Sequence, residues 1–308
     1  MSWPDRVAGS DTGDRIAIVV VNYQTRELVS QLVFSLYRIL GRDQFVQLVV
    51  VDNASRDGSD RTLGALHDAG LLHLIRNRRQ RYHGPALNQA VSWLADRQPG
   101  VSPSHRADFI WLLDSDVVVL RREVVRDAVA TFGETGAAII GEGVAEHRVA
   151  LNSLMLDPGK AWRGDLPPFE NSGSPDWPLQ EAARDAGLVI APFPFNYGSY
   201  VLHLGRGTMG KLLETGERRN RFYGWASEHR ERHYSDHPLG RRLHEAVLRL
   251  YREEVADESP EALVRACERS ELFRIPEARP LPPMEELVRL HEQGVDLTEH
   301  LVQRFADD

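Results

Sequence analysis

Apolar runs alternate with helical segments along the first 120 residues of the chain. Four runs consist mainly of apolar residues, many of them β-branched, which is typical of strands buried on both faces of a parallel sheet. Between them, apolar residues recur every three or four positions and predict helices. The predicted strands are 15–23, 45–53, 71–77 and 107–116, and the predicted helices are 25–40, 59–70 and 84–96. This order predicts an α/β fold with an open, mostly parallel sheet and helices on both faces.

The pattern weakens after residue 116. Helices are predicted at 123–132 and 178–187, shorter strands at 137–143, 147–156, 188–195 and 199–207, and a Pro/Gly-rich loop at 157–178. From about residue 208 the chain is charged and helical in pattern, with a proline-rich break at 275–283 and a last helix at 284–294. We therefore expect a flexible tail at 1–14, an α/β domain at 15–207 and a helical C-terminal appendage at 208–308.

The composition narrows the classes of function. The formal net charge of -8 makes a nucleic-acid-binding protein a poor expectation. Cys267 is the single cysteine, so one chain has neither a disulfide framework nor a cysteine zinc site. The N-terminal residues lack the apolar core of a signal peptide, and no apolar run is long enough to span a bilayer. We expect a cytoplasmic protein, with peripheral contact to a membrane left open.

Polar residues stand at the carboxyl ends of the predicted parallel strands, where such sheets bind ligands. Asp114 and Asp116 interrupt the apolar run LLDSDVVVL. Two carboxylates at a strand end can hold Mg²⁺ or Mn²⁺, and the ion can then bridge a diphosphate. The alternative is a solvated strand end in which Asp116 caps a turn.

Two further strand ends carry candidate ligand groups. Asp52 closes the strand 45–53 and can accept hydrogen bonds from a base or ribose, while the following NASRDGS fits either function or turn capping. The segment RNRRQRYHGPALNQAV has four arginines at 76–81 and then Gly84 at a helix start. A helix N-terminus behind a basic loop favours anions, although a solvated basic loop is the plain alternative.

Four segments in this order, IAIVVVNYQTREL, LVVVDNASRDGS, RNRRQRYHGPALNQAV and WLLDSDVVVL, resemble the GT-A-fold glycosyltransferases of the inverting family 2. The likeness extends over about residues 15–205, and DSD is similar to the DXD motif of that family. It implies a Rossmann-like GT-A fold, with residues 15–116 as the nucleotide-sugar-binding half and 117–207 as the acceptor half. The resemblance further implies that donor contacts come from the following residues: Val21 and Tyr23 beside the nucleobase, Asp52 accepting its N–H, Asn77 and Asn88 at base or ribose, and Asp114 at ribose and metal.

The later family motifs match less evenly. YVLHLGRGT resembles the segment with a metal-binding histidine, which implies Asp114, Asp116 and His203 as ligands of Mn²⁺ or Mg²⁺. Members of this family often carry a Glu-Asp pair before a helix that ends in glycine, and the second acid is the catalytic base. Here SPDWPLQEAARDAG stands in that place: a proline replaces the first acid, and Asp176 corresponds to the second. Glu170 and Glu181 are reserve candidates. Without the resemblance, His203 fits a core histidine and Asp176 a helix N-cap.

The expected function is a metal-dependent inverting glycosyltransferase that uses a nucleoside-diphosphate sugar and an unidentified acceptor, which is a small molecule, a glycan or a lipid-linked molecule. A sugar nucleotidyltransferase and a non-catalytic nucleotide-sugar-binding relative are the alternatives. His229 and His233, spaced i, i+4, could bind zinc, but HRERH lacks the order of the HExxH motif. The segment 218–225 could shape the acceptor site, and the C-terminal helices could form a homodimer.

Overall fold

The computed structural model describes residues 15–97, 107–145, 148–161, 169–196, 200–205 and 238–276, together with residues 278, 289–290 and 293–295. Within them, seven strands form one sheet in the order β3-β2-β1-β4-β7-β6-β8, and β5 pairs with β9 in a separate ribbon. The strands are β1 (Ile16–Asn22), β2 (Gln47–Asp52), β3 (His73–Arg76), β4 (Phe109–Asp114), β5 (Val117–Val119), β6 (Ile139–Ala145), β7 (Arg148–Leu156), β8 (Ile190–Pro192) and β9 (Val201–His203).

The sheet is mostly parallel, as the sequence predicts. Strands β3, β2, β1 and β4 run in one direction, and β8 is parallel to β6. Strand β7 is antiparallel to both β4 and β6. The four strands predicted from the first third of the chain therefore form the parallel half, and their carboxyl ends meet at one edge.

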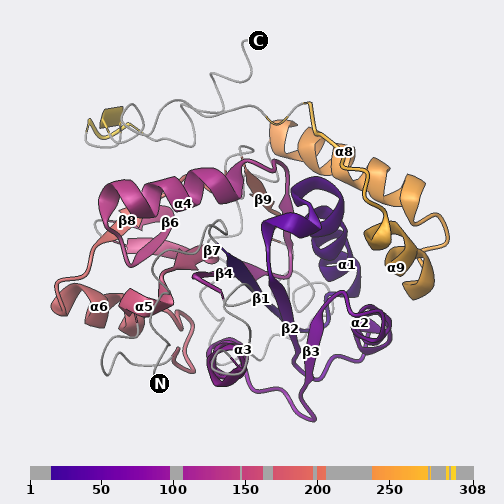
Figure 1. Ribbon diagram of the computed structural model, residues 1–308, viewed down its shortest axis with the longest axis horizontal. Coiled ribbons are helices and arrows are strands. Elements are labelled where there is room, and N and C mark those ends of the chain that lie inside the picture. The colour runs from indigo at the N-terminus through magenta and orange to yellow at the C-terminus, as the bar shows by residue number, and fades with distance from the viewer. Residues whose placement is uncertain are drawn as a thin grey trace.

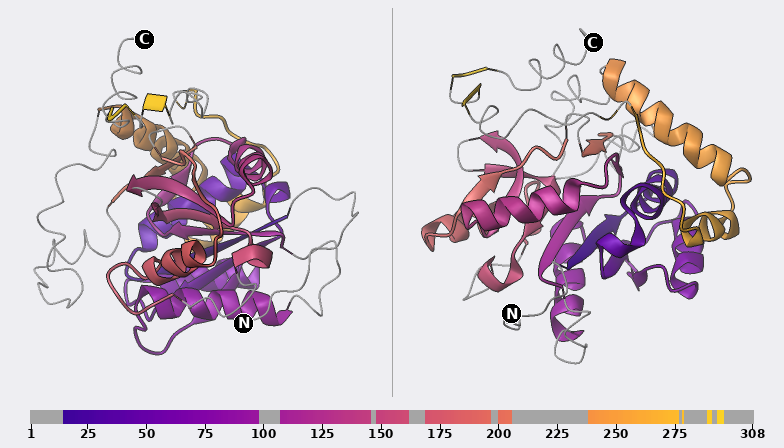
Figure 2. Two further views of the ribbon diagram at one scale, coloured as in Figure 1. Left: turned by 90° about the vertical axis from the view of Figure 1, so that its left-hand side faces the viewer. Right: turned by 45° about the horizontal axis from the view of Figure 1, so that its top comes forward.

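Helices cover both faces of the sheet (Figure 1 and Figure 2). The helices are α1 (Arg26–Ser35), α2 (Ser59–Asp68), α3 (His83–Arg97), α4 (Val124–Thr135), α5 (Pro158–Ala161), α6 (Trp177–Asp185), α8 (Pro238–Glu254) and α9 (Pro260–Glu268), with the π-helical turn η1 (Leu36–Leu40) and the 3₁₀ turn η2 (Arg42–Gln44). Alternate residues of β1 point to opposite faces. Ile16 and Ile18 join a core with α1, α2, α4 and α9, whereas Ala17 and Val19 join a core with α3 and α6.

The described part of the C-terminal region packs into the α/β core. Leu263 of α9 lies in the same apolar cluster as the β1 side chains. Leu243 and Val247 of α8 pack with Val118 and Leu202, so this helix supports the β5–β9 ribbon. The boundary at 207/208 stays a prediction, but these helices share their apolar faces with the sheet domain.

A buried arginine fastens this region to η1. Arg38 is 0% exposed, and its Nη1 lies 2.6 Å from an oxygen of Glu254. The guanidinium also donates to the carbonyl oxygens of Ala266 and Glu271, at 3.0 and 2.9 Å, and stacks on Phe273. A buried charge needs such partners, because desolvation costs several kcal/mol.

The other predictions of elements have mixed outcomes. The strand predicted at 188–195 is shorter, because Pro192 and Pro194 have no N–H to donate to a neighbouring strand. The predicted tail 1–14, the segment 206–237 and most of the predicted helix 284–294 lie outside the described residues. None of the described helices is both long and apolar enough to cross a membrane.

Candidate active site

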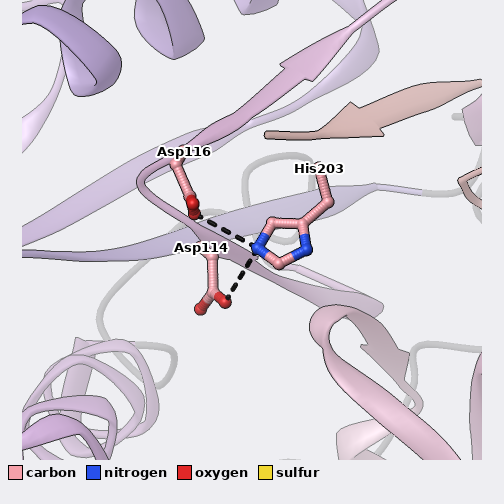
Figure 3. Close-up of side chains that lie close together, drawn as sticks. All are labelled: Asp114, Asp116 and His203. Carbon is pink, nitrogen blue, oxygen red and sulfur yellow. Dashed lines mark ion pairs between the residues drawn. The ribbon is translucent and has the colours of Figure 1, made fainter. Parts of the chain in front are cut away.

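Three side chains that could share a metal ion meet at the carboxyl edge of the parallel strands (Figure 3). Asp114 is the last residue of β4, and Asp116 precedes β5. His203 ends β9 and pairs with Val117 of β5, so the ribbon turns the imidazole toward both acids. The imidazole Nε2 lies 3.8 Å from Asp114 Oδ2 and 3.4 Å from Asp116 Oδ1. The three ligand atoms lie within 4.8 Å of one another.

A second layer of polar groups fixes these side chains. The side-chain amide of Asn152 on β7 contacts His203 Nδ1 at 3.0 Å, and Nε2 faces the acids; when Nε2 binds a metal, Nδ1 carries a hydrogen and the amide would turn its oxygen toward it. The His203 backbone N–H donates to Asn196 Oδ1 at 3.2 Å, and the Asn196 backbone N–H donates to Glu142 Oε2 at 2.8 Å. Such a layer is what orients histidine ligands in metal sites.

The electrostatics of the cluster favour a cation. Burial raises the pKa of the Asp114 carboxyl, and the charge of Asp116 raises it further against the opposing effect of His83. Burial lowers the pKa of His203, but the charge and hydrogen bond of Asp116 and the charge of Asp114 outweigh burial and raise it to about 9. The two acids therefore draw positive charge, and without a metal that charge is a proton on His203.

The donor set fits Mn²⁺ or Mg²⁺. Hard divalent cations prefer carboxylate oxygens, and imidazole is an additional ligand that Mn²⁺ accepts more readily than Mg²⁺. Asp116 is 4% exposed, whereas the Asp114 side chain is 28% exposed, so the cluster opens to solvent on the Asp114 side. A cation held there would keep coordination positions for a ligand from outside the protein.

The predicted donor-binding residues at β1 and β2 lie at the same edge. The Val21 side chain packs in the core beneath α3, and Tyr23 follows β1 half-buried. Asp52 is 3% exposed and accepts hydrogen bonds from Asn22 Nδ2 at 2.9 Å and from the backbone N–H of Ser55 at 3.2 Å. Asp52 thus orders its own loop, and its contact with a nucleobase stays a prediction.

Asn77 and Asn88, which were predicted to contact the donor, make hydrogen bonds within the protein. Asn88 exchanges two hydrogen bonds with the backbone of Phe169, at 2.7 and 2.9 Å. Asn77 donates to Asn53 Oδ1 at 3.1 Å and exchanges amide hydrogen bonds with Gln89 at 2.8 and 3.0 Å. Both amides have intramolecular partners, and contact of either with base or ribose stays a prediction.

Asp176, the predicted base, is 4% exposed and directly precedes α6. Asp176 occupies the N-cap position of α6, as the alternative interpretation predicts, but its side chain makes no capping hydrogen bond. Its Oδ2 instead accepts from Gln180 Nε2 at 2.5 Å. Burial raises the pKa of Asp176, and Arg148, Gln180 and His83 only partly oppose the effect. The reserve candidates Glu170 and Glu181 are exposed.

The sequence interpretation missed His83. Its Nε2 lies 3.8 Å from Asp114 Oδ1, and its charge also contributes to lowering the pKa of Asp176. Gly84 permits this arrangement, because a Cβ there would lie 1.9 Å from the carbonyl oxygen of Glu170. The glycine at the predicted start of this helix was the one sequence signal of a close backbone approach, but a glycine does not reveal which distant segment packs against it.

Trp177 and Arg148 were also missed. Trp177 follows Asp176 and is 41% exposed, and the Arg148 guanidinium carbon lies 3.4 Å from the centre of its ring. This stacking holds an exposed indole beside the candidate base. The zinc alternative at His229 and His233, and the segment 218–225, lie outside the described residues.

Residues 17–175, slightly more than half of the chain, match the family model of glycosyl transferase family 2, so the chain belongs to this family. The predicted resemblance and the GT-A, Rossmann-like fold class are thereby confirmed. No curated protein matches the chain at a significant level.

Several solved structures are similar to the chain. TarS 1–349 of S. aureus in complex with UDP-GlcNAc is 18% identical, with 61% of this chain and 57% of that chain covered and a TM-score of 0.45. The mannosyltransferase PcManGT of Pyrobaculum calidifontis, in complex with GDP-Man and Mn²⁺, is 14% identical. The match covers 95% of this chain and 84% of that chain, with a TM-score of 0.49. Glucosyl-3-phosphoglycerate synthase of Mycobacterium tuberculosis, in complex with Mg²⁺ and UDP, is 15% identical. The match covers 58% of this chain and 69% of that chain, with a TM-score of 0.41. The chain spans 59% of free TarS 1–349.

Proposed function

We propose that the protein is a metal-dependent, inverting glycosyltransferase that moves a sugar from a nucleoside-diphosphate sugar to an acceptor hydroxyl. The observation that supports this most is the group of Asp114, Asp116 and His203, whose ligand atoms lie within 4.8 Å of one another at the sheet edge where such folds bind ligands. Family membership supplies the reaction class. Among the similar solved structures, TarS 1–349 is in complex with UDP-GlcNAc, and PcManGT is in complex with GDP-Man and Mn²⁺.

The donor would bind across the ends of β1, β2 and β4, with Val21, Tyr23, Asp52, Asn77 and Asn88 toward its nucleoside. Mn²⁺ or Mg²⁺ in the cluster would neutralise the diphosphate as it departs. Asn152 keeps the imidazole of His203 turned toward the acids, so the ligand set is ordered before the donor arrives.

Asp176 would take the proton of the acceptor hydroxyl. A carboxylate with a raised pKa is a better general base than one with an ordinary value, provided that it remains ionised at working pH. Gln180 donates to Oδ2 of Asp176, and the acceptor hydroxyl would approach Oδ1. The acceptor oxygen would then attack the anomeric carbon on the face opposite to the diphosphate, which inverts its configuration.

The acceptor would lie over Trp177. An exposed ring next to the base offers a flat apolar surface, and pyranose rings present such a surface through their C–H groups. Arg148 fixes the indole from its other side. We also propose a homodimer through the C-terminal helices and a cytoplasmic location.

The proposal is tested by thermal-shift measurements with a panel of nucleotide sugars, each with and without Mn²⁺. We expect one donor to raise the melting temperature only when metal is present, because a ligand that binds the folded state stabilises it. Asp116→Asn should abolish the shift, and Asp68→Asn, at an exposed acid of α2, should retain it. If no nucleotide sugar stabilises the metal-loaded protein, the proposal is wrong.

Product analysis separates the reaction from its alternatives. Transfer releases a nucleoside diphosphate, whereas a sugar nucleotidyltransferase releases pyrophosphate. A non-catalytic relative would bind the donor and release neither. The anomeric configuration of the product, determined by NMR, tests inversion directly.

A further inference from the structure

The loop between β3 and α3 carries an unusual concentration of positive charge. We define the arginine loop as residues 77–82, which contain Arg78, Arg79, Arg81 and Tyr82. No acidic residue occurs between Arg76 and Asp96, although the chain as a whole has a formal net charge of -8. The three guanidinium groups are exposed, and none has an ion pair or a side-chain hydrogen bond with any residue that the structure describes.

Buried amides, and not the arginines, hold the loop in shape. Asn53 is 2% exposed, and its Oδ1 accepts from the backbone N–H of Arg81 at 2.9 Å and from Asn77 at 3.1 Å. Its Nδ2 donates to the carbonyl oxygen of Tyr82 at 3.1 Å. The backbone is therefore ordered from below, and the arginine side chains are not needed for its structure.

Tyr82 adds an aromatic group to the same surface. Its φ is 64°, in the left-handed region that costs a residue other than glycine about 1 kcal/mol or more. Its side chain is 38% exposed, one of three large apolar side chains with this exposure among the described residues. Tyrosine is favoured where one side of a surface is apolar and the other is wet.

The loop projects beyond the sheet at the edge that carries the candidate active site (Figure 1 and Figure 2). Exposed Arg56 stands in the neighbouring loop after β2, which Asn53 links to the arginine loop. Several solvent-facing guanidinium groups without an ion pair to the described residues suit a broad anionic surface better than a single phosphate, because a phosphate site normally encloses its ligand with converging donors.

We propose that the arginine loop docks the protein on a membrane that contains anionic phospholipids. The guanidinium groups would contact lipid phosphates, and the Tyr82 ring would lie at the level of the headgroups. The sheet edge with Asp114, Asp116 and His203 would then lie close to the bilayer. This membrane contact goes beyond the proposed transfer reaction and does not depend on it.

The test is co-sedimentation of the full chain with vesicles of phosphatidylcholine alone and of phosphatidylcholine with phosphatidylglycerol. We expect binding to the anionic vesicles only, with a decrease as salt is added. The triple variant R78Q/R79Q/R81Q should lower the partition coefficient roughly 100-fold, since each basic residue near such a surface contributes about 1 kcal/mol.

The matched control is R241Q/R242Q/R249Q, which removes three exposed arginines of α8. It should change partitioning less than about threefold if the loop is the contact, and both variants should keep the wild-type melting temperature. Failure of the wild-type chain to bind anionic vesicles, or equal losses in both variants, would overturn the proposal. So would unchanged vesicle binding of the loop variant with loss of the nucleotide-sugar thermal shift, since the arginines would then serve the donor.

Discussion

A proton should compete with manganese at the cluster of Asp114, Asp116 and His203. Burial alone would lower the pKa of His203, but the two acids raise it to about 9. Metal coordination requires the neutral imidazole. At pH 7, two units below this pKa, about 1% of the imidazole is neutral, which weakens the apparent metal affinity about 100-fold, or ~2.7 kcal/mol.

The expected dependence has a defined direction. The apparent Mn²⁺ affinity should rise about tenfold per pH unit between pH 6 and 8 and level off above pH 9. The stability of the metal-free protein should change in the opposite sense. The folded-state pKa of His203 lies above its unfolded value, so its stabilising contribution is complete below about pH 6.5 and is lost as the pH rises through about 9.

Isothermal titration with MnCl₂ in buffers of different ionisation enthalpy measures both affinity and proton release. We expect close to one proton to be released per Mn²⁺ at pH 7 in the wild-type protein. His203→Asn should bind more weakly, without that release and with a much flatter pH profile. Zero proton release by the wild-type protein, or an affinity independent of pH, would refute the electrostatic reasoning.

Three further predictions concern the base, the acceptor surface and the packing beneath them. Asp176→Asn should lower kcat by at least about 100-fold and leave donor binding intact, measured by turnover and by thermal shift; unchanged turnover would remove Asp176 from its role. Trp177→Ala should raise the acceptor KM about five- to tenfold with an unchanged donor KM, whereas Val189→Ala, at another exposed apolar side chain, should change neither. Gly84→Ala should destabilise the protein by about 1–3 kcal/mol in chemical denaturation, because the new methyl group meets the neighbouring backbone. Gly133→Ala, where a Cβ would meet no atom within 4 Å, should not destabilise, and equal effects of the two glycine changes would contradict the packing argument.

Much of the fold could be predicted from the chain because buried parallel strands have a distinctive composition. The residues directly before Asp52 and Asp114 are apolar, and parallel strands must place their carboxyl ends at one edge. For the candidate metal cluster, the proximity of Asp114 and Asp116 was predictable because they are close in sequence. His203 needed the family resemblance, since no local pattern distinguishes a ligand from a core histidine.

Contacts between distant segments could not be predicted. Gly84 lets the start of α3 pack against the backbone at residue 170, and His83, one residue earlier, lies 3.8 Å from Asp114. The amide of Asn88 fits a ligand-binding role and a structural role equally well until its partner Phe169 is known. Likewise, Arg38 is buried and donates to the carbonyl oxygen of Ala266 in α9, although its position in a helical pattern gives no sign of burial.

The packing of α8 beneath the β5–β9 ribbon sets a lower limit on the length of an active fragment. The family match ends at residue 175, yet the strand that presents His203 rests on Leu243 and Val247. A protein shortened to its family-matched portion would lack Asp176 and His203 themselves, and it would also lack α8 and the partners of the Arg38 guanidinium, which are Glu254, Ala266 and Glu271. Catalytic competence and solubility should therefore disappear together when the chain is trimmed from its C-terminal side.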